Sequence, residues 1–227
     1  MTSSSVVPYR MPDAVPVPDD SPCWTIDPHR SALLVEHMQK PVLRALRDTA
    51  PVGELVANIG RLVHCARSGG VPVLYVTAAP GRQVAAGGVR PAARPDPVPP
   101  EEEFAEAEAR AVVEVLQPQT GDTVLAAKRY SAFAGTRLRS RLKELGRDQL
   151  VVVGATARTD VLLTAADAWM QDLRPVVVAD AVADRTAAHH AMAVQWLADT
   201  CSMVTLTDSV AAAFRTRTGS PQAAAAT

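Results

Sequence analysis

The chain has 227 residues (24.0 kDa), of which 48% are hydrophobic and 21% charged, as in ordinary globular proteins. A chain of this size buries enough apolar surface to fold without a disulfide or a structural metal, and we expect a single domain. Its formal net charge of −1 excludes binding to nucleic acid or anionic lipid through a general excess of basic charge, although it leaves room for a local basic patch.

Residues 1–30 carry prolines at 8, 12, 16, 18, 22 and 28, a spacing that excludes a helix and predicts an extended arm lying on the body. After the arm, short apolar runs alternate with stretches of helical periodicity. The predicted strands cover 31–37, 71–78, 123–127, 149–156, 175–182 and 203–206. The predicted helices cover 43–67, with a break at Pro51, then 101–116, 136–145, 159–172 and 187–200, followed by a terminal helix.

Two segments are predicted to lie outside this regular pattern. Residues 80–100 are dense in glycine, proline and arginine and predict a loop long enough to act as a lid. Residues 218–227 predict a frayed tail, so the expected domain spans 31–217.

The alternation of apolar strands and helices predicts an α/β protein with a doubly wound, six-stranded parallel sheet covered by helices on both faces. In such sheets ligands bind at the carboxyl ends of the strands, near the switch in strand order. Because the sequence contains neither G-x-G-x-x-G nor G-K-[ST], we expect no nucleotide cofactor and no other cofactor.

The cysteines Cys23, Cys65 and Cys201 are widely spaced and form neither a C-x-x-C pair nor a cluster with histidine. They predict a reduced, cytoplasmic protein without a bound metal. No stretch reaches the roughly 18 apolar residues of a membrane-spanning helix, and the first residues lack the apolar core of a signal peptide. We therefore expect a small-molecule substrate, and neither a membrane nor a nucleic acid as partner.

Four segments are similar to one known family: WTIDPHRSALLVEHMQ (24–39), RYSAF (129–133), GRDQLVVVGATA (146–157) and TAADAWMQDLRPVVVADAVAD (164–184). They resemble the isochorismatase-like superfamily, also called cysteine hydrolases. The similarity is greatest to the isochorismatases and aminodeoxyisochorismate hydrolases of siderophore and phenazine pathways. The resemblance implies the predicted fold and a homodimer or larger homo-oligomer.

The positions that carry chemistry in the family are altered here. His37 stands where the family has an acid, and Ala127 where it has a lysine, with Lys128 one residue late and on the opposite face of the strand. Val161 stands where many members have a cysteine nucleophile, and Asp160 where glycine is common. The missing cysteine argues against amide hydrolysis through an acyl-enzyme. It does not exclude catalysis, because some vinyl-ether hydrolases of the family lack it and protonate their substrate with the aspartate.

We predict that His37 and Asp160 are the catalytic residues. The first and fourth predicted strands are neighbours in this fold, so Asp160 can reach His37 and orient it as an acid/base dyad. The alternatives are that His37 is a hydrogen-bonded remnant of a dead site, and that Asp160 or Thr159 only caps the following helix.

The predicted substrate-binding residues lie at the ends of three strands: Gln39, Lys128, Arg129, Tyr130, Phe133, Thr156, Arg158 and Val161. For Lys128 the alternative is a solvated side chain, for Arg129 a structural role, and for Arg158 a surface contact. The acids Asp180 and Asp184 are expected to accept hydrogen bonds from loop amides, and His189 and His190 lack the further ligands that a metal requires.

Two functions of different classes follow from these residues. The first is an enzyme of small-molecule biosynthesis that uses acid/base chemistry on a small cyclic metabolite, by vinyl-ether hydrolysis or by isomerisation or cyclisation. The second is a non-catalytic member that binds a ligand or supports an oligomer, which the inert residues Ala127 and Val161 favour.

Overall fold

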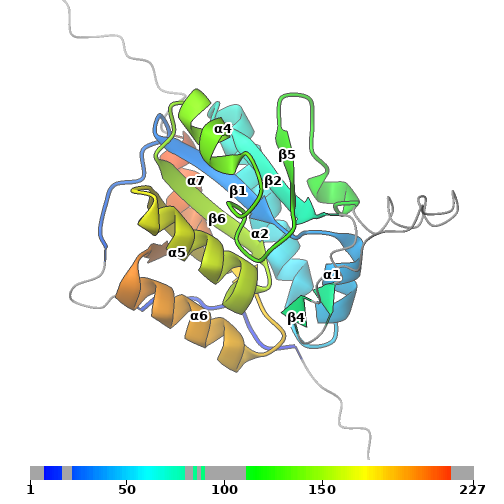
Figure 1. Ribbon diagram of the computed structural model, residues 1–227. Helices are drawn as coiled ribbons and strands as arrows, with labels where there is room; N and C mark the ends of the chain where they lie inside the picture. Colours follow the sequence, from blue (N-terminus) through cyan, green and yellow to red (C-terminus); the bar gives the residue numbers. More distant parts are fainter. Residues whose placement is uncertain (1–7, 17–21, 80–83, 86–87, 90–110, 216–227) are drawn as a thin grey trace, which may run out of the picture.

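The computed structural model describes residues 8–16, 22–79, 84–85, 88–89 and 111–215. At its centre lies a parallel sheet with the strand order β5-β2-β1-β6-β7-β8 (Figure 1). These strands are β1 (Ser31–Glu36), β2 (Val73–Ala78), β5 (Thr123–Ala127), β6 (Gln149–Ala155), β7 (Arg174–Ala183) and β8 (Met203–Thr205). The predicted doubly wound, six-stranded fold is confirmed.

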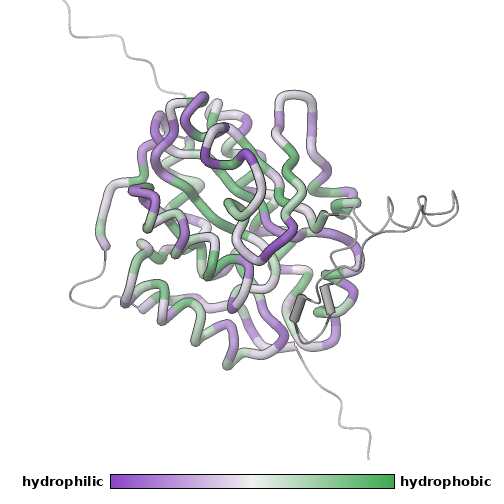
Figure 2. Tube along the Cα trace, in the orientation of Figure 1, coloured by the Kyte–Doolittle hydropathy of each residue, from purple (hydrophilic) through white to green (hydrophobic). Residues whose placement is uncertain are grey.

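Helices cover both faces of the sheet, because successive strand residues point to opposite sides. In β1, Leu33 and Val35 enter one apolar cluster, the α2 core, while Ala32 and Leu34 enter the other, the α5 core. The α2 core is completed by α1 (Lys40–Leu46), α2 (Val52–Ser68) and α7 (Thr207–Arg215). The α5 core is completed by α4 (Leu138–Glu144), α5 (Leu162–Met170) and α6 (Ala187–Thr200). Figure 2 shows the resulting hydrophobic centre and the mixed polarity of the helices around it.

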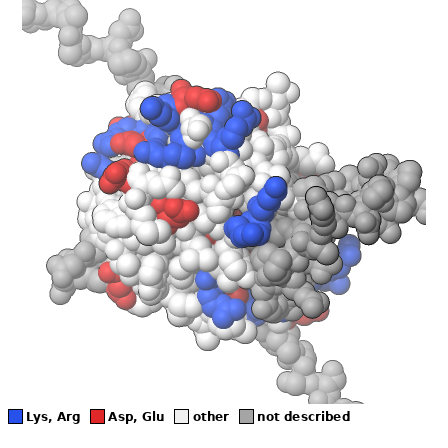
Figure 3. All heavy atoms as spheres, in the orientation of Figure 1, with Lys and Arg blue, Asp and Glu red and all other residues white. Residues whose placement is uncertain are grey.

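The outer surface of α4 is basic. Lys and Arg side chains gather over this helix in the upper part of Figure 3, and α4 itself contributes Arg139, Arg141 and Lys143. One of these charges is paired, since Arg141 lies 3.2 Å from the Glu144 carboxylate. The nearly neutral chain therefore carries a local basic surface.

The switch in strand order lies between β1 and β6. From β1 the chain builds outward to β2 and β5 on one side, and from β6 to β7 and β8 on the other. The carboxyl ends of β1 and β6 therefore meet at the crevice where ligands bind in doubly wound proteins.

Three predicted helices differ from the structure. The predicted helix 43–67 is two helices, α1 and α2, separated around Pro51 as the proline suggested. The helix predicted at 159–172 begins earlier, with a π-helical turn, η2 (Ala157–Val161), that leads into α5.

For the third helix, predicted at 101–116, only residues 111–116 are described, and there the prediction is wrong. Val112 forms an antiparallel bridge with Gln39, the Val113 N–H donates to the Met38 carbonyl at 3.0 Å, and a 3-10 helix, η1 (Glu114–Leu116), follows. Pairing with the end of β1 overrides the local helical pattern here, helped by the β-branched side chains of Val112 and Val113.

The remaining predictions fall largely outside the described residues. In the segment 80–100 only two short strands are described, β3 (Val84–Ala85) and β4 (Gly88–Val89), which pair antiparallel. The tail 218–227 lies beyond the described part. The described parts of the arm, 8–16 and 22–30, contain no helix, and Tyr9, Met11 and Trp24 pack against the α2 core. Among the helices described, none is both long and apolar enough to cross a membrane.

Candidate active site

The site lies where β1 and β6 end side by side, at two residues with unusual backbone conformation. His37 directly follows β1 with φ 51°, and Thr156 follows β6 with φ 62°. Positive φ is uncommon in residues other than glycine, and for a β-branched threonine it is a true outlier. Such conformations persist where the surrounding structure holds them, which is common at functional sites.

The two strands approach closely just before these residues. Glu36 and Gly154 face each other in the β1–β6 register. Two features exclude a side chain at position 154: the glycine φ of 138° and the closeness of the Glu36 backbone. A Cβ on Gly154 would lie 2.1 Å from the Glu36 carbonyl oxygen. The glycine thus sets the short spacing between the chain segments that carry His37 and Asp160.

His37 and Asp160 form a buried pair. His37 Nε2 lies 3.0 Å from Asp160 Oδ1, and their side chains are 2% and 1% exposed. The other carboxylate oxygen, Oδ2, accepts hydrogen bonds from the hydroxyls of Thr156 at 2.7 Å and Thr159 at 3.0 Å. The two hydroxyls fix the carboxylate, and the carboxylate in turn fixes the orientation of the imidazole.

The second ring nitrogen of His37 also faces an acceptor. Nδ1 lies 3.4 Å from Gln39 Oε1, a longer contact, and the same oxygen accepts the Ala78 N–H at 3.1 Å. Because a backbone N–H needs an acceptor at this point, the amide oxygen of Gln39 must point toward the ring. An imidazolium, with two N–H donors, would satisfy both acceptors at once. Both ring nitrogens of His37 thus face a hydrogen-bond acceptor.

The turn that carries Asp160 is anchored from the neighbouring strand. The Arg158 N–H donates to Asp184 Oδ2 at 2.8 Å, and Asp184 Oδ1 accepts the Arg185 N–H at 2.7 Å. Asp180 behaves similarly, since its Oδ1 accepts the Thr207 N–H at 2.7 Å. Both carboxylates accept hydrogen bonds from backbone amides, as expected from the sequence.

The two positions at which the resemblance suggested a lysine and a cysteine lie in the core. Ala127 and Val161 are both 0% exposed and both belong to the α5 core. Lys128 is exposed, in step with Val124 and Ala126 on the outer side of the edge strand β5. Its side chain thus lies on the side of the strand away from the buried Ala127.

The other predicted binding residues fall into two groups. The side chains of Arg129 and Arg158 are exposed, and the Arg129 guanidinium donates to the Lys128 carbonyl at 3.3 Å. Tyr130 and Phe133 are half-buried, and Phe133 packs against the α5 core.

The structure thus brings together four predicted residues, His37, Gln39, Thr156 and Asp160. The hydroxyl of Thr159 joins them, although the sequence suggested only a helix cap for it. In the described ranges no three His, Cys, Asp or Glu side chains converge on a possible metal position.

Comparison with known proteins places the chain in one family. The model of the Isochorismatase domain matches residues 31–209. The phenazine biosynthesis protein PhzD of Pseudomonas fluorescens is 40% identical over 212 residues, which cover 91% of this chain and 97% of that protein. The isochorismatase of Bacillus subtilis is 36% identical over 218 residues, covering 92% of this chain and 66% of that protein. The crystal structure of an isochorismatase from Pseudomonas putida KT2440 superposes with a TM-score of 0.65 at 26% identity, covering 83% of this chain and 93% of that one. The chain therefore belongs to the isochorismatase family.

Proposed function

We propose that the chain is an enzyme of small-molecule biosynthesis in which His37, oriented by Asp160, donates and accepts the proton of the reaction. The observation that carries the proposal is the buried contact of 3.0 Å between His37 Nε2 and Asp160 Oδ1 at the switch point of the sheet. The names of its relatives, a phenazine biosynthesis protein and an isochorismatase, favour a small cyclic vinyl ether as substrate.

The proposed reaction is vinyl-ether hydrolysis. His37, as imidazolium, transfers a proton to the terminal methylene carbon of the enol ether, which leaves an oxocarbenium ion. Water adds to this ion and returns a proton to the imidazole. The resulting hemiketal then breaks into a ketone and the ring alcohol. The Asp160 carboxylate stabilises the imidazolium before it gives up its proton and again after the proton returns, and it keeps the neutral ring oriented in between.

Nδ1 is the proposed working nitrogen. The shorter contact, from Nε2 to Asp160, orients the ring, whereas the contact of 3.4 Å to Gln39 is the one that a substrate atom can replace. In this proposal Tyr130 and Phe133, which follow β5, form walls of the substrate pocket, and Arg129 and Arg158 offer positive charge at its outer edge for an anionic substrate.

Two other functions are supported by specific observations. The same pair can move a proton within one substrate, which gives isomerisation or cyclisation without loss of a fragment. The complete burial of Ala127 and Val161 in the α5 core instead supports a non-catalytic, ligand-binding member, because two positions that carry chemistry in the family hold only aliphatic side chains here.

One experiment separates the three. The full chain is incubated with isochorismate or its 2-amino-2-deoxy analogue. Released 2-oxo acid is measured with a coupled dehydrogenase, and products are weighed by mass spectrometry. Hydrolysis releases the 2-oxo acid, whereas isomerisation gives a product of unchanged mass. A non-catalytic protein shows only an increase in Tm with ligand, by binding to the folded state.

The role of His37 is tested in the same assay. His37→Gln is expected to lower kcat by about 100-fold or more, the usual contribution of a general acid. His64→Gln is the matched control, because His64 lies exposed on α2, and it should retain full activity. Full activity of His37→Gln would refute the mechanism.

A further inference from the structure

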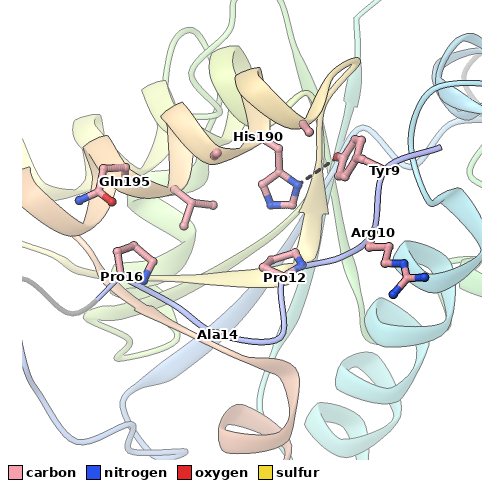
Figure 4. Close-up of a pocket in the computed structure, with 10 residues that line it drawn as sticks. Tyr9, Arg10, Pro12, Ala14, Pro16, His190 and Gln195 are labelled. Carbon is pink, nitrogen blue, oxygen red and sulfur yellow. Dashed lines mark hydrogen bonds between the residues drawn. The ribbon is translucent and has the colours of Figure 1, made fainter. Parts of the chain in front are cut away.

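The N-terminal arm makes a specific polar contact with the body through Tyr9. Its hydroxyl accepts the Asp184 N–H at 3.1 Å and lies 3.0 Å from His190 Nδ1, and the two rings meet edge to face at 5.5 Å. Figure 4 shows the arm running along α6, with Tyr9 turned toward His190. This part of the arm precedes the segment 31–209 that matches the family model.

Both rings are uncharged at neutral pH. Burial raises the pKa of Tyr9 to about 12 and lowers the pKa of His190. His190 Nε2 lies 3.0 Å from the Ala179 carbonyl, so the proton of the neutral ring belongs on Nε2. Nδ1 is then an acceptor. The Tyr9 hydroxyl accepts the Asp184 N–H, and its own proton faces two acceptors, His190 Nδ1 at 3.0 Å and the Asp184 carbonyl at 3.3 Å.

Asp184 connects Tyr9 to the turn that carries Asp160. Its backbone N–H is held by Tyr9, and its buried carboxylate accepts the Arg158 N–H at 2.8 Å. Arg158 lies two residues before Asp160 in the π-helical turn η2. The turn starts after Thr156 in the left-handed region, a conformation that needs support from outside the turn.

We propose that Tyr9 is a positioning residue for the His37–Asp160 pair: it holds Asp184, Asp184 holds the Arg158 amide, and the turn so anchored presents Asp160 to His37. This inference rests on the proposed function of that pair. It assigns to the arm a role in setting the geometry of the site.

The test compares Tyr9→Phe, which keeps the ring and removes the hydroxyl, with Tyr75→Phe. Tyr75 is a matched control because its hydroxyl accepts a hydrogen bond from Arg67 at 3.2 Å, its pKa is also raised to about 12, and it has no contact with the turn η2 among the described hydrogen bonds. The first readout is the NMR signal of the His37 ring nitrogens in ¹⁵N-labelled protein, which reports the contact with Asp160 without any substrate.

We expect Tyr9→Phe to shift or broaden the His37 signals, and Tyr75→Phe to leave them unchanged. With a substrate in hand, Tyr9→Phe should lower kcat by about 3- to 10-fold, the equivalent of one neutral hydrogen bond, with KM within about two-fold of wild type. Asp184→Asn, which weakens the next contact in the series, should shift the same signals and carries the test if Tyr9→Phe does not fold.

Unchanged His37 signals in both Tyr9→Phe and Asp184→Asn would overturn the proposal. A wild-type protein without turnover would refute the proposed function alone, because the NMR readout does not depend on activity.

Discussion

Replacing Gly154 by alanine tests the close approach of β1 and β6 on which the site depends. The glycine has φ 138°, a conformation that side-chain-bearing residues rarely adopt. An added Cβ would lie 2.1 Å from the Glu36 carbonyl oxygen and 2.8 Å from the Glu36 nitrogen and carbonyl carbon. These are backbone atoms of the neighbouring strand, so a side-chain rotation cannot relieve the contact and the strands must separate.

The cost is the sum of two effects. Holding alanine at this φ costs about 1–3 kcal/mol, and separating the strands weakens at least one ladder hydrogen bond, at about 0.5–1.5 kcal/mol. We therefore expect Gly154→Ala to lower the free energy of unfolding by about 1.5–4.5 kcal/mol. The separation also moves His37 away from Asp160, so activity should fall more than the folded fraction does.

Urea unfolding followed by circular dichroism measures the effect. Gly60→Ala is the control, because Gly60 lies within α2 and an added Cβ would meet only Leu116 Cδ2, at 3.7 Å. It should stabilise the protein by about 0.5–1 kcal/mol, as alanine is the better helix former. A Gly154→Ala protein within about 0.5 kcal/mol of wild type would show that the reasoning about strand spacing is wrong.

Three further predictions concern the buried polar groups and the core. His37→Asp places two carboxylates where a contact of 3.0 Å now joins unlike groups, so the folded pair must keep a proton. His37→Asp should therefore lower Tm more at pH 8 than at pH 5, and adding Asp160→Gly should restore the lost Tm. An equal loss of Tm at both pH values would contradict this account. Burial lowers the pKa of His190, so the unfolded chain takes up its proton first as the pH falls. Stability from this residue is therefore complete above the ordinary histidine pKa of about 6.5 and lost below it, and His190→Gln should flatten the fall of Tm between pH 7 and pH 5. Val161→Cys should lower the free energy of unfolding, measured with urea, by less than about 1.5 kcal/mol, because the two side chains have similar volumes. It should not release ammonia from small amides, because a thiol in apolar surroundings keeps its proton; measurable release would show that the nucleophile alone was missing.

The sequence by itself determined the sheet and its order of elements. Continuous apolar runs such as QLVVVGA can be satisfied only as buried strands, and the helical stretches between them require parallel strands covered on both faces. The same reasoning placed His37 at the end of the first strand and Asp160 after the fourth, because strand ends are marked by an abrupt change from apolar to polar residues.

Only the tertiary structure decided how these residues meet. Along a strand, side chains point alternately to the two faces of the sheet. The left-handed conformations of His37 and Thr156 end this alternation, so the sequence could not predict where either side chain points. Residues 111–113 are extended because Val112 pairs with Gln39 after the end of β1, against the local helical pattern. The contact of Tyr9 with Asp184 joins residues 175 positions apart. Local propensity acts over a few residues, whereas such contacts exist only once the whole chain has folded, and they are the ones that shape the site.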